Sequence, residues 1–359
     1  MIKSHKTHGA AVALAAALLA ALALAVPAGA ARAPLEPSGK RVFFGVSDTG
    51  DPADFGAFTT ALGQHPAVIQ SFRAWGSDFP QSIVRWQTAR ARPMLHITTA
   101  DPQDGHETIT PLAIARGKGD DYLVRLNLLF ARKKMRAYVR PLAEPNRCLN
   151  VYAAYDCAGN WRDVAHGTRA YKRAFRRIYV IVHGGGKRPK INRRLREAGL
   201  PPLRAKVGGL PKAPVAVVWS PLPAGSPTTP RNRPRFFYPG SRWTDWVGTD
   251  LYSDNQDWKA LTGLYRRFSG KPFAIPEWGV SSGDDPTYVR KLMTWVQRHQ
   301  RTKLLVYYQD FGSASSYRIQ NWPASLRVLK SRLRSPRFPS FAPGAPRLPP
   351  PPPGGVAAR

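Results

Sequence analysis

Acidic residues and cysteines are scarce in this 359-residue sequence, and each shortage excludes something. Only 22 Asp and Glu stand against 54 Lys and Arg, and the resulting net charge of +32 predicts attraction to polyanions. Two cysteines without a nearby pair of histidines cannot form a zinc ligand set, so we expect no metal site. With 43% hydrophobic and 11% aromatic residues, the chain is not a disordered protein and can bury a substantial core.

Two kinds of binding motif are also missing. The first expected strand continues as Gly45-Val46-Ser47-Asp48 and not as G-x-G-x-x-G, which disfavours a dinucleotide-binding Rossmann fold. Gly184-Gly185-Gly186 follows an expected helix, so we interpret it as a helix terminus and not as a phosphate-binding loop. No ribonucleoprotein sequence or other known reading module is present, so we expect no specific nucleic-acid partner.

One long hydrophobic run occurs, at the amino terminus. Lys3 and Lys6 precede an apolar stretch, Ala10–Val26, and the small residues Ala28-Gly29-Ala30 follow it. This layout predicts a secretory signal peptide over residues 1–30, followed by a linker at 31–39. The alternative is an uncleaved membrane anchor, because the run is close to the ~20 residues that span a bilayer. Both alternatives place the domain outside the cytoplasm.

Export affects how the charge and the cysteines are interpreted. Without Lys3 and Lys6, 52 basic residues face 22 acidic ones, a net charge of +30. For a secreted protein, the matching polyanions are anionic cell-wall polymers or lipid head groups, so we expect cell-wall association; general solvation is the alternative. Cys148 and Cys157 lie nine positions apart, and in an exported chain they predict a disulfide that closes a short loop.

Eight β-rich segments alternate with helix-compatible or irregular ones. The expected strands are Arg41–Asp48, Val68–Gly76, Pro93–Thr99, Arg136–Glu144, Val215–Ser220, Trp246–Tyr252, Pro272–Glu277 and Lys303–Asp310. Apolar residues recur at three- and four-residue steps, as amphipathic helices require, in Asp120–Lys134, Ala165–Val182 and Pro286–Gln300. Eight such units over about 300 residues predict an α/β fold, a (β/α)8 TIM barrel.

We expect this barrel to form a single domain over residues 40–334, in a monomer. The Pro-, Gly- and Arg-rich stretches 184–214 and 221–242 are interpreted as long loops after the fourth and fifth strands. Residues 335–359 contain nine prolines, five of them consecutive from Pro349 to Pro353, and are expected to be a disordered or polyproline II tail.

Two glutamates end expected strands of the barrel. Glu144 ends the fourth strand and Glu277 ends the seventh, in a chain with few acids. The carboxyl ends of barrel strands carry the reacting groups, and two facing carboxyls are what glycoside cleavage needs. The alternative is that each glutamate caps a backbone group or pairs with one of the many arginines. Asp48 and Asp250 also end strands, and His96 in the third strand is interpreted as a core residue.

The segments around these glutamates carry a family resemblance. Four motifs follow one another along the chain: Arg140-Pro-Leu-Ala-Glu144-Pro-Asn146, Val217-Val-Trp219-Ser-Pro221, Trp246-Val-Gly-Thr-Asp250-Leu-Tyr252 and Lys271-Pro-Phe-Ala-Ile-Pro-Glu277-Trp-Gly279. Together, over residues 40–330, they resemble glycoside hydrolase family 26, the β-mannanase-like group of clan A. The resemblance implies a retaining, endo-acting hydrolase of a β-linked polysaccharide. Mannan is the default substrate, a β-glucan or cell-wall polymer is the alternative, and no cofactor is expected.

The resemblance also implies roles for particular residues. Glu144 is the expected general acid/base and Glu277 the expected nucleophile, with their carboxyls ~5–5.5 Å apart. Tyr252 matches the family tyrosine that hydrogen-bonds the nucleophile. Arg140, on the same strand as Glu144, fits a charge partner for a carboxylate. Three aromatic residues are candidates for the floor of a sugar subsite, with burial in the core as the alternative: Trp219, Trp278 and Tyr308.

One departure from the family pattern bears on activity. The residue before the acid/base is usually histidine or asparagine and is Ala143 here, and Asn146 is a candidate replacement for the lost substrate hydrogen bond. Two other functions therefore stay open. One is a non-catalytic carbohydrate- or wall-binding protein on a glycosidase-like barrel, because a fold does not imply activity. The other is nucleic-acid binding through the basic surface.

Overall fold

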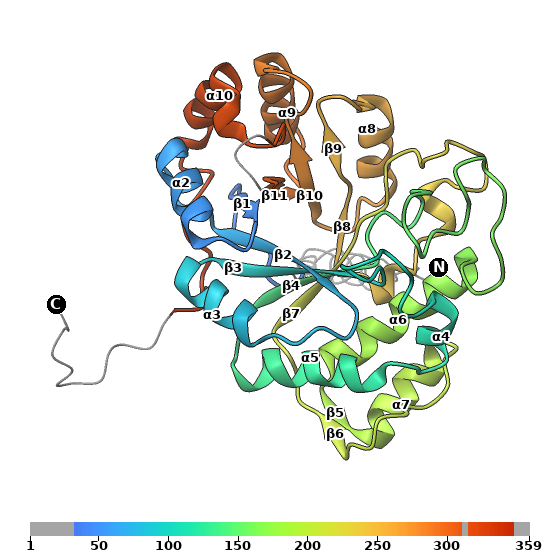
Figure 1. Cartoon of the computed structure of the whole chain (residues 1–359). Helices are drawn as coiled ribbons and strands as arrows, with labels where there is room; N and C mark the ends of the chain where they lie inside the picture. Colours follow the sequence, from blue (N-terminus) through green and yellow to red (C-terminus); the bar gives the residue numbers. More distant parts are fainter. Residues whose placement is uncertain (1–31, 311–314, 348–359) are drawn as a thin grey trace, which may run out of the picture. The chain divides into compact units, whose positions relative to one another are not determined.

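A computed structural model gives the fold of the chain and describes residues 32–310 and 315–347. The expected signal peptide lies outside the described residues. Eight parallel strands form a closed barrel, because the last barrel strand pairs with the first, and helices lie between successive strands (Figure 1). The predicted (β/α)8 barrel is therefore confirmed. Within the described residues, no helix has both the length and the apolar character needed to cross a membrane.

The barrel strands follow one another around the barrel in chain order. They are β1 (Phe43–Ser47), β2 (Val68–Ala74), β3 (Arg92–Thr98), β4 (Ala137–Pro141), β7 (Val215–Trp219), β8 (Trp246–Gly248), β10 (Phe273–Gly279) and β11 (Thr302–Tyr307). A short strand, β9 (Leu251–Tyr252), continues the line of β8 after a break and pairs with the end of β10. All eight predicted strands are present, each within a few residues of its expected bounds.

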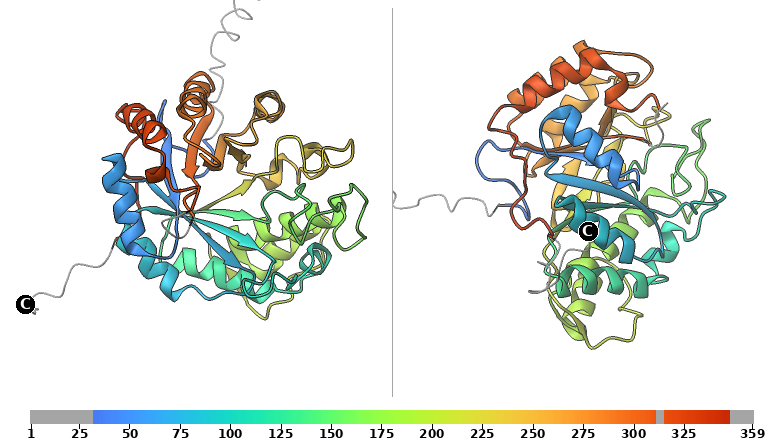
Figure 2. Two further views of the ribbon diagram at one scale, coloured as in Figure 1. Left: turned by 45° about the horizontal axis from the view of Figure 1, so that its top comes forward. Right: turned by 60° about the vertical axis from the view of Figure 1, so that its left-hand side comes forward.

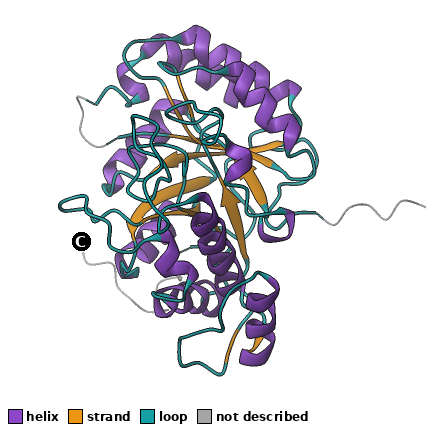
Figure 3. Ribbon diagram, turned by 90° about the vertical axis from the view of Figure 1, so that its right-hand side faces the viewer, coloured by secondary structure: helices purple, strands orange, loops and turns teal. Residues whose placement is uncertain are grey.

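Helices surround the strands, as the views in Figures 2 and 3 show. They are α2 (Pro52–Leu62), α3 (Pro80–Ala89), α4 (Pro111–Ala115), α5 (Asp120–Arg132), α6 (Thr168–His183), α7 (Arg188–Glu197), α8 (Trp258–Arg267), α9 (Pro286–Arg298) and α10 (Pro323–Leu333), with the 3-10 turns η1 (Pro234–Phe236), η2 (Ser241–Trp243) and η3 (Ile319–Asn321). The three predicted helices correspond to α5, α6 and α9. The start of α9 is as predicted, because the Asp285 carboxylate accepts a hydrogen bond from the Tyr288 N–H at 2.8 Å and Pro286 occupies the first turn.

Strand alternation divides the core into two layers. Side chains such as Phe43, Tyr138 and Trp246 fill the barrel interior. Their sequence neighbours, such as Phe44 and Val139, point outward into a larger cluster beneath the helices. Because successive strand residues point to opposite faces, this alternation decides which residues near a strand end can reach the barrel mouth.

One expected loop contains regular structure. Residues 184–214, predicted to be irregular, include helix α7 and a small hairpin of β5 (Gly186–Lys187) and β6 (Gly209–Leu210), which lie together at the bottom of Figure 1. The basic, Pro-containing sequence conceals the helix, although Ile191 and Leu195 form a buried i, i+4 pair on it. The glycine run is placed as expected, since Gly184 ends α6 with φ of 58°.

The packed domain extends beyond the predicted limits of 40 and 334. At the amino ends of the strands, Tyr138 donates a hydrogen bond to the Leu35 carbonyl at 2.9 Å, and Arg92 donates to the Pro343 carbonyl at 2.7 Å. Phe338 is only 4% exposed. Both flanking segments therefore lie against the end of the barrel that the amino ends of the strands form. Their proline content concealed this, because polyproline-like segments can pack through carbonyls and apolar side chains without forming regular structure.

Candidate active site

An arginine at the carboxyl end of β4 joins two acids from other strands. Arg140 is fully buried; its guanidinium contacts the carboxylates of Glu277 and Asp250 and donates to the Ser220 hydroxyl at 2.8 Å. Burial alone would lower the pKa of Arg140, but Asp250 and Glu277 raise it above its ordinary value, so the group stays charged. Burial raises the pKa of Asp250 well above its usual range, and the nearby Glu277 and Glu144 add to the rise.

A β-bulge turns Glu277 into the barrel mouth. Ala274 faces the barrel interior, so strict alternation would place Glu277 on the outer face. The pairing of β10 with β11 instead slips by one residue between Ile275 and Trp278. The extra residue reverses the alternation, so Glu277 reaches Arg140 and Trp278 points outward. Bulges of this kind often re-aim a side chain beside an active site.

Glu144 reaches the mouth by a different route. The chain leaves β4 at Pro141, and both Leu142 and Glu144 adopt left-handed backbone conformations, with φ of 48° and 49°. Non-glycine residues in this region carry strain and concentrate at functional sites. The Glu144 N–H donates to the Ser220 carbonyl at 2.7 Å, and its carboxylate accepts from the partly exposed Arg147 guanidinium at 2.9 Å. The side chain is 11% exposed and remains open to solvent.

Aromatic side chains line the mouth near Glu277. The Tyr252 hydroxyl donates to the Glu277 carboxylate at 2.9 Å, and burial followed by the charge of Glu277 raises the pKa of Tyr252 well above its ordinary value. Tyr252 therefore stays protonated as a donor. Tyr308 contacts the rings of Tyr252, Tyr317 and Phe72 edge-on. Tyr252 and Tyr308 thus lie where the sequence placed them, and Tyr317 and Phe72 extend the aromatic wall.

His96 belongs to this site, contrary to its interpretation as a core residue. Its Nδ1 lies 3.9 Å from a Glu277 carboxylate oxygen, and its ring packs edge-on against Phe72. Among the described residues, neither ring nitrogen has a hydrogen-bond partner. Burial, with the charge of Arg140, lowers the pKa of His96 well below its ordinary value, so the ring is neutral. A neutral imidazole without a protein partner can hydrogen-bond a substrate hydroxyl.

Three predicted substrate-binding residues lie elsewhere. Asn146 uses its side-chain oxygen and nitrogen to bind the backbone of Leu222, at 2.8 and 2.9 Å, so it does not replace the polar neighbour lost at Ala143. Trp219 is fully buried outside the barrel against Tyr238 and Phe268. Trp278 is equally buried on the outer side of β10, because of the bulge. For both tryptophans the core alternative is correct.

The described contacts support neither an Asp48–Glu277 carboxylate pair nor a serine hydrolase site. Asp48 accepts a hydrogen bond from Arg85 at 2.8 Å and from Ser71 at 3.3 Å, and does not meet Glu277 in the described contacts. The segment Gly279–Gly283 matches the G-x-S-x-G pattern of serine hydrolases. The side chain of its central serine, Ser281, contacts Ser253, and its described partners include no histidine.

The Cys148–Cys157 disulfide is present, as predicted, in the loop directly after Glu144. The loop is also joined to the segment after β7, because the Cys148 N–H donates to the Ser226 carbonyl at 2.7 Å. A double Cys148→Ser/Cys157→Ser variant is expected to lose ~2–3 kcal/mol of unfolding free energy, since closing a loop of this length restricts the unfolded chain. Urea unfolding measures the loss; an unchanged midpoint would contradict the prediction.

A histidine joins two loops at the mouth. His166, before α6, places Nε2 2.7 Å from Glu107 of the β3–α4 loop and Nδ1 2.7 Å from Asp163. The hydrogen bond to Glu107, more than the one to Asp163, raises the pKa of His166 above 6.5. A raised folded-state pKa gives a stabilisation that is complete below about pH 6.5 and is lost as pH rises through the folded-state value.

The His166→Gln variant tests the direction of this pH dependence of stability. We expect its melting temperature to fall below that of the wild type by more at about pH 5.5 than at about pH 8.5, because only the protonated ring donates to both carboxylates. Thermal unfolding of both proteins across this range provides the measurement. A difference that stays constant, or that grows with pH, would show that His166 does not act through its charge.

The fold is shared with solved mannanase structures. A mannanase from Bacillus subtilis superposes with a TM-score of 0.53 at 20% identity, covering 84% of this chain and 87% of that one. A GH26 β-mannanase from Bacteroides ovatus gives 0.56 at 16% identity, covering 84% and 91%. The GH26 domain of a Prevotella bryantii endo-β-mannanase/endo-β-glucanase gives 0.52 at 13%, covering 84% and 90%.

These similarities extend over most of the chain and are similarities of fold. No protein-family model matches the sequence. No curated protein matches it in sequence.

Proposed function

We propose that this protein is a secreted glycoside hydrolase that cleaves a β-linked polysaccharide with retention, using Glu144 and Glu277. One observation carries the proposal: Glu144, after β4, and Glu277, on β10, lie at the same barrel mouth. Arg140 and Tyr252 both contact the Glu277 carboxylate there. Carboxylate pairs at the carboxyl ends of barrel strands perform glycoside cleavage. The neighbouring structures are named as mannanases, so mannan is the proposed substrate.

The proposed reaction has two steps. Glu277 attacks the anomeric carbon while Glu144 donates its proton to the glycosidic oxygen, which leaves with the rest of the chain. Glu144, now a carboxylate, takes a proton from water as that water attacks the glycosyl ester and frees Glu277. Arg140 and Tyr252 orient Glu277 for attack, because both donate hydrogen bonds to its carboxylate oxygens.

Release of reducing ends from mannan, β-glucan, xylan and isolated cell walls tests the proposal. We expect wild-type activity on at least one polymer and its loss in both Glu144→Gln and Glu277→Gln. Activity that persists in both variants would assign the hydrolysis to other groups. A wild type that is inactive on all four substrates would refute the proposal.

A non-catalytic wall-binding protein is the second candidate. Three observations favour it: Ala143 supplies no polar side chain, Asn146 is occupied by Leu222, and Arg147 is paired with the carboxylate that has to donate a proton. With a net charge of +30 without Lys3 and Lys6, such a protein would be held on an anionic envelope. Salt-sensitive sedimentation with cell walls, without release of reducing ends, would support it.

A further inference from the structure

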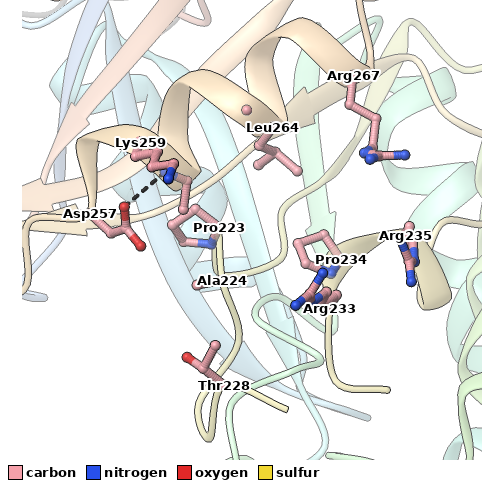
Figure 4. A pocket seen from close by; sticks show the side chains of 12 residues that line it. Pro223, Ala224, Thr228, Arg233, Pro234, Arg235, Asp257, Lys259, Leu264 and Arg267 are labelled. Atoms are coloured by element: carbon pink, nitrogen blue, oxygen red, sulfur yellow. Dashed lines mark hydrogen bonds between the residues drawn. The ribbon is translucent and has the colours of Figure 1, made fainter. Parts of the chain in front are cut away.

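A basic hollow lies between the loop after β7 and helix α8 (Figure 4). Its volume is about 500 Å³, within the range of small-ligand pockets. Four residues line both this hollow and an inner hollow of about 280 Å³: Pro223, Ala224, Thr228 and Asp257. Tyr252, whose hydroxyl contacts Glu277, also lines the inner hollow. The two hollows therefore share one wall, and the inner one extends to Tyr252.

Four cationic side chains surround the basic hollow: Arg233, Arg235, Lys259 and Arg267. Figure 4 shows Lys259 beside Asp257 at the start of α8, and Arg267 at the other end of this helix, above Arg235. All four are exposed, and none forms a hydrogen bond or ion pair with another described residue. The one acidic residue of the lining, Asp257, is engaged with the helix, because its carboxylate accepts from the Ala260 N–H at 2.8 Å. Four cations therefore face one carboxylate, and the lining keeps a net positive charge.

The rest of the lining is mainly apolar. It includes Pro223, Pro234 and Leu264, with Thr228 as its one uncharged polar side chain. Apolar walls suit the C–H faces of sugar rings, and surrounding cations suit negative substituents on those rings. A neutral glycan would leave the four charges without partners, whereas an acidic one would neutralise them in a concave site.

We propose that the basic hollow is a binding subsite for negatively charged sugar residues of the polysaccharide substrate, at a distance from the bond that is cleaved. This inference rests on the proposed glycosidase function and gives its substrate class: a glycan with carboxylate or sulfate groups. The inner hollow adjoins the basic one and is lined by Tyr252, so in this proposal a single polysaccharide chain spans both hollows and the catalytic mouth.

Binding of matched glycans tests the subsite independently of hydrolysis. Neutral mannan, the same mannan oxidised to the C6 carboxylate, and the same mannan sulfated are titrated into the full chain at moderate salt. The affinity of the wild type for at least one charged form is expected to exceed that for neutral mannan. The oxidised and sulfated arms distinguish the two sources of charge.

A pair of variants separates the subsite from general basicity. Arg233→Ser/Arg235→Ser removes two charges from the hollow, and Arg132→Ser/Lys133→Ser removes two exposed charges from another basic hollow on the outside of α5. Exposed ionic contacts are individually weak, so the first variant is expected to bind the preferred charged glycan about 5- to 10-fold more weakly. The α5 variant is expected to bind like the wild type.

Three results would overturn the inference: equal losses in both variants, no preference of the wild type for a charged glycan, or no binding to any of the three. Failure of the proposed glycosidase function gives a different result from failure of the subsite. Hydrolysis of neutral mannan with no preference for charge would refute the subsite and keep the enzyme. Charge-selective binding through Arg233 and Arg235 without hydrolysis would keep the subsite and refute the enzyme.

Discussion

The Glu277→Gln variant is expected to lose at least about a thousandfold in kcat on the polysaccharide and on an aryl glycoside with an activated leaving group. An amide cannot attack the anomeric carbon, so the first step fails whatever the leaving group. Glu144→Gln is expected to behave differently. An activated phenolate leaves without a proton, so the glycosyl ester forms at near wild-type rate and then accumulates, because the general base for its hydrolysis is missing.

Burst kinetics and mass spectrometry of the two variants measure this difference. A mass increase equal to one glycosyl unit is expected in Glu144→Gln and not in Glu277→Gln. The fold of Glu277→Gln should persist, since the amide oxygen can accept from Arg140 while the amide nitrogen donates to Tyr252. A glycosyl ester that forms in Glu277→Gln and not in Glu144→Gln would reverse the two roles.

The Arg140→Leu variant is expected to lose about 3–5 kcal/mol of unfolding free energy at neutral pH. Its guanidinium is the cation that contacts both Asp250 and Glu277, and removing one side of a buried ion pair leaves an uncompensated charge. Because burial already raises the pKa of Asp250, this residue takes up a proton readily and the loss should shrink at acidic pH. Urea unfolding at two pH values provides the measurement.

Arg177→Leu is the matched control. Arg177 of α6 is as deeply buried and holds Asp120 through two hydrogen bonds of 2.6 Å, away from the barrel mouth. A similar loss of stability is expected, with kcat unchanged well below the melting temperature, whereas Arg140→Leu should lose activity even when folded. Adding Asp250→Leu to Arg140→Leu should restore part of the stability; a further loss would show that Asp250 does not carry the penalty.

The choice between a hydrolase and a non-catalytic glycan-binding protein depends on a few residues of the candidate site. If the ion pair with Arg147 keeps the Glu144 side chain away from the glycosidic oxygen, the site binds a glycan without cleaving it. His96 lies beside Glu277 as a neutral imidazole with no hydrogen-bond partner among the described residues, but both of its ring nitrogens are buried. It therefore presents no exposed polar contact in place of those that Ala143 and Asn146 do not supply.

The sequence alone was sufficient for the fold and for the position of the main acids. Runs of apolar β-branched and aromatic residues place all eight strands, because a buried parallel strand must be apolar on both faces. The three amphipathic helices and the Cys148–Cys157 pair follow from local patterns as well. Glu144 and Glu277 were identifiable because so few acids end strands in this chain, and their motifs carried the family resemblance.

Only the tertiary structure decided how individual side chains point and which of them meet. Alternation from the buried Val218 would have placed Trp219 outside the barrel, but the same rule fails at Trp278, where a bulge set by pairing with β11 reverses the two faces. Asn146 is occupied by a backbone 76 positions away, and His96 meets Glu277 across the barrel mouth. Local periodicity fixes the elements, whereas register shifts and contacts between distant segments depend on how the whole barrel closes.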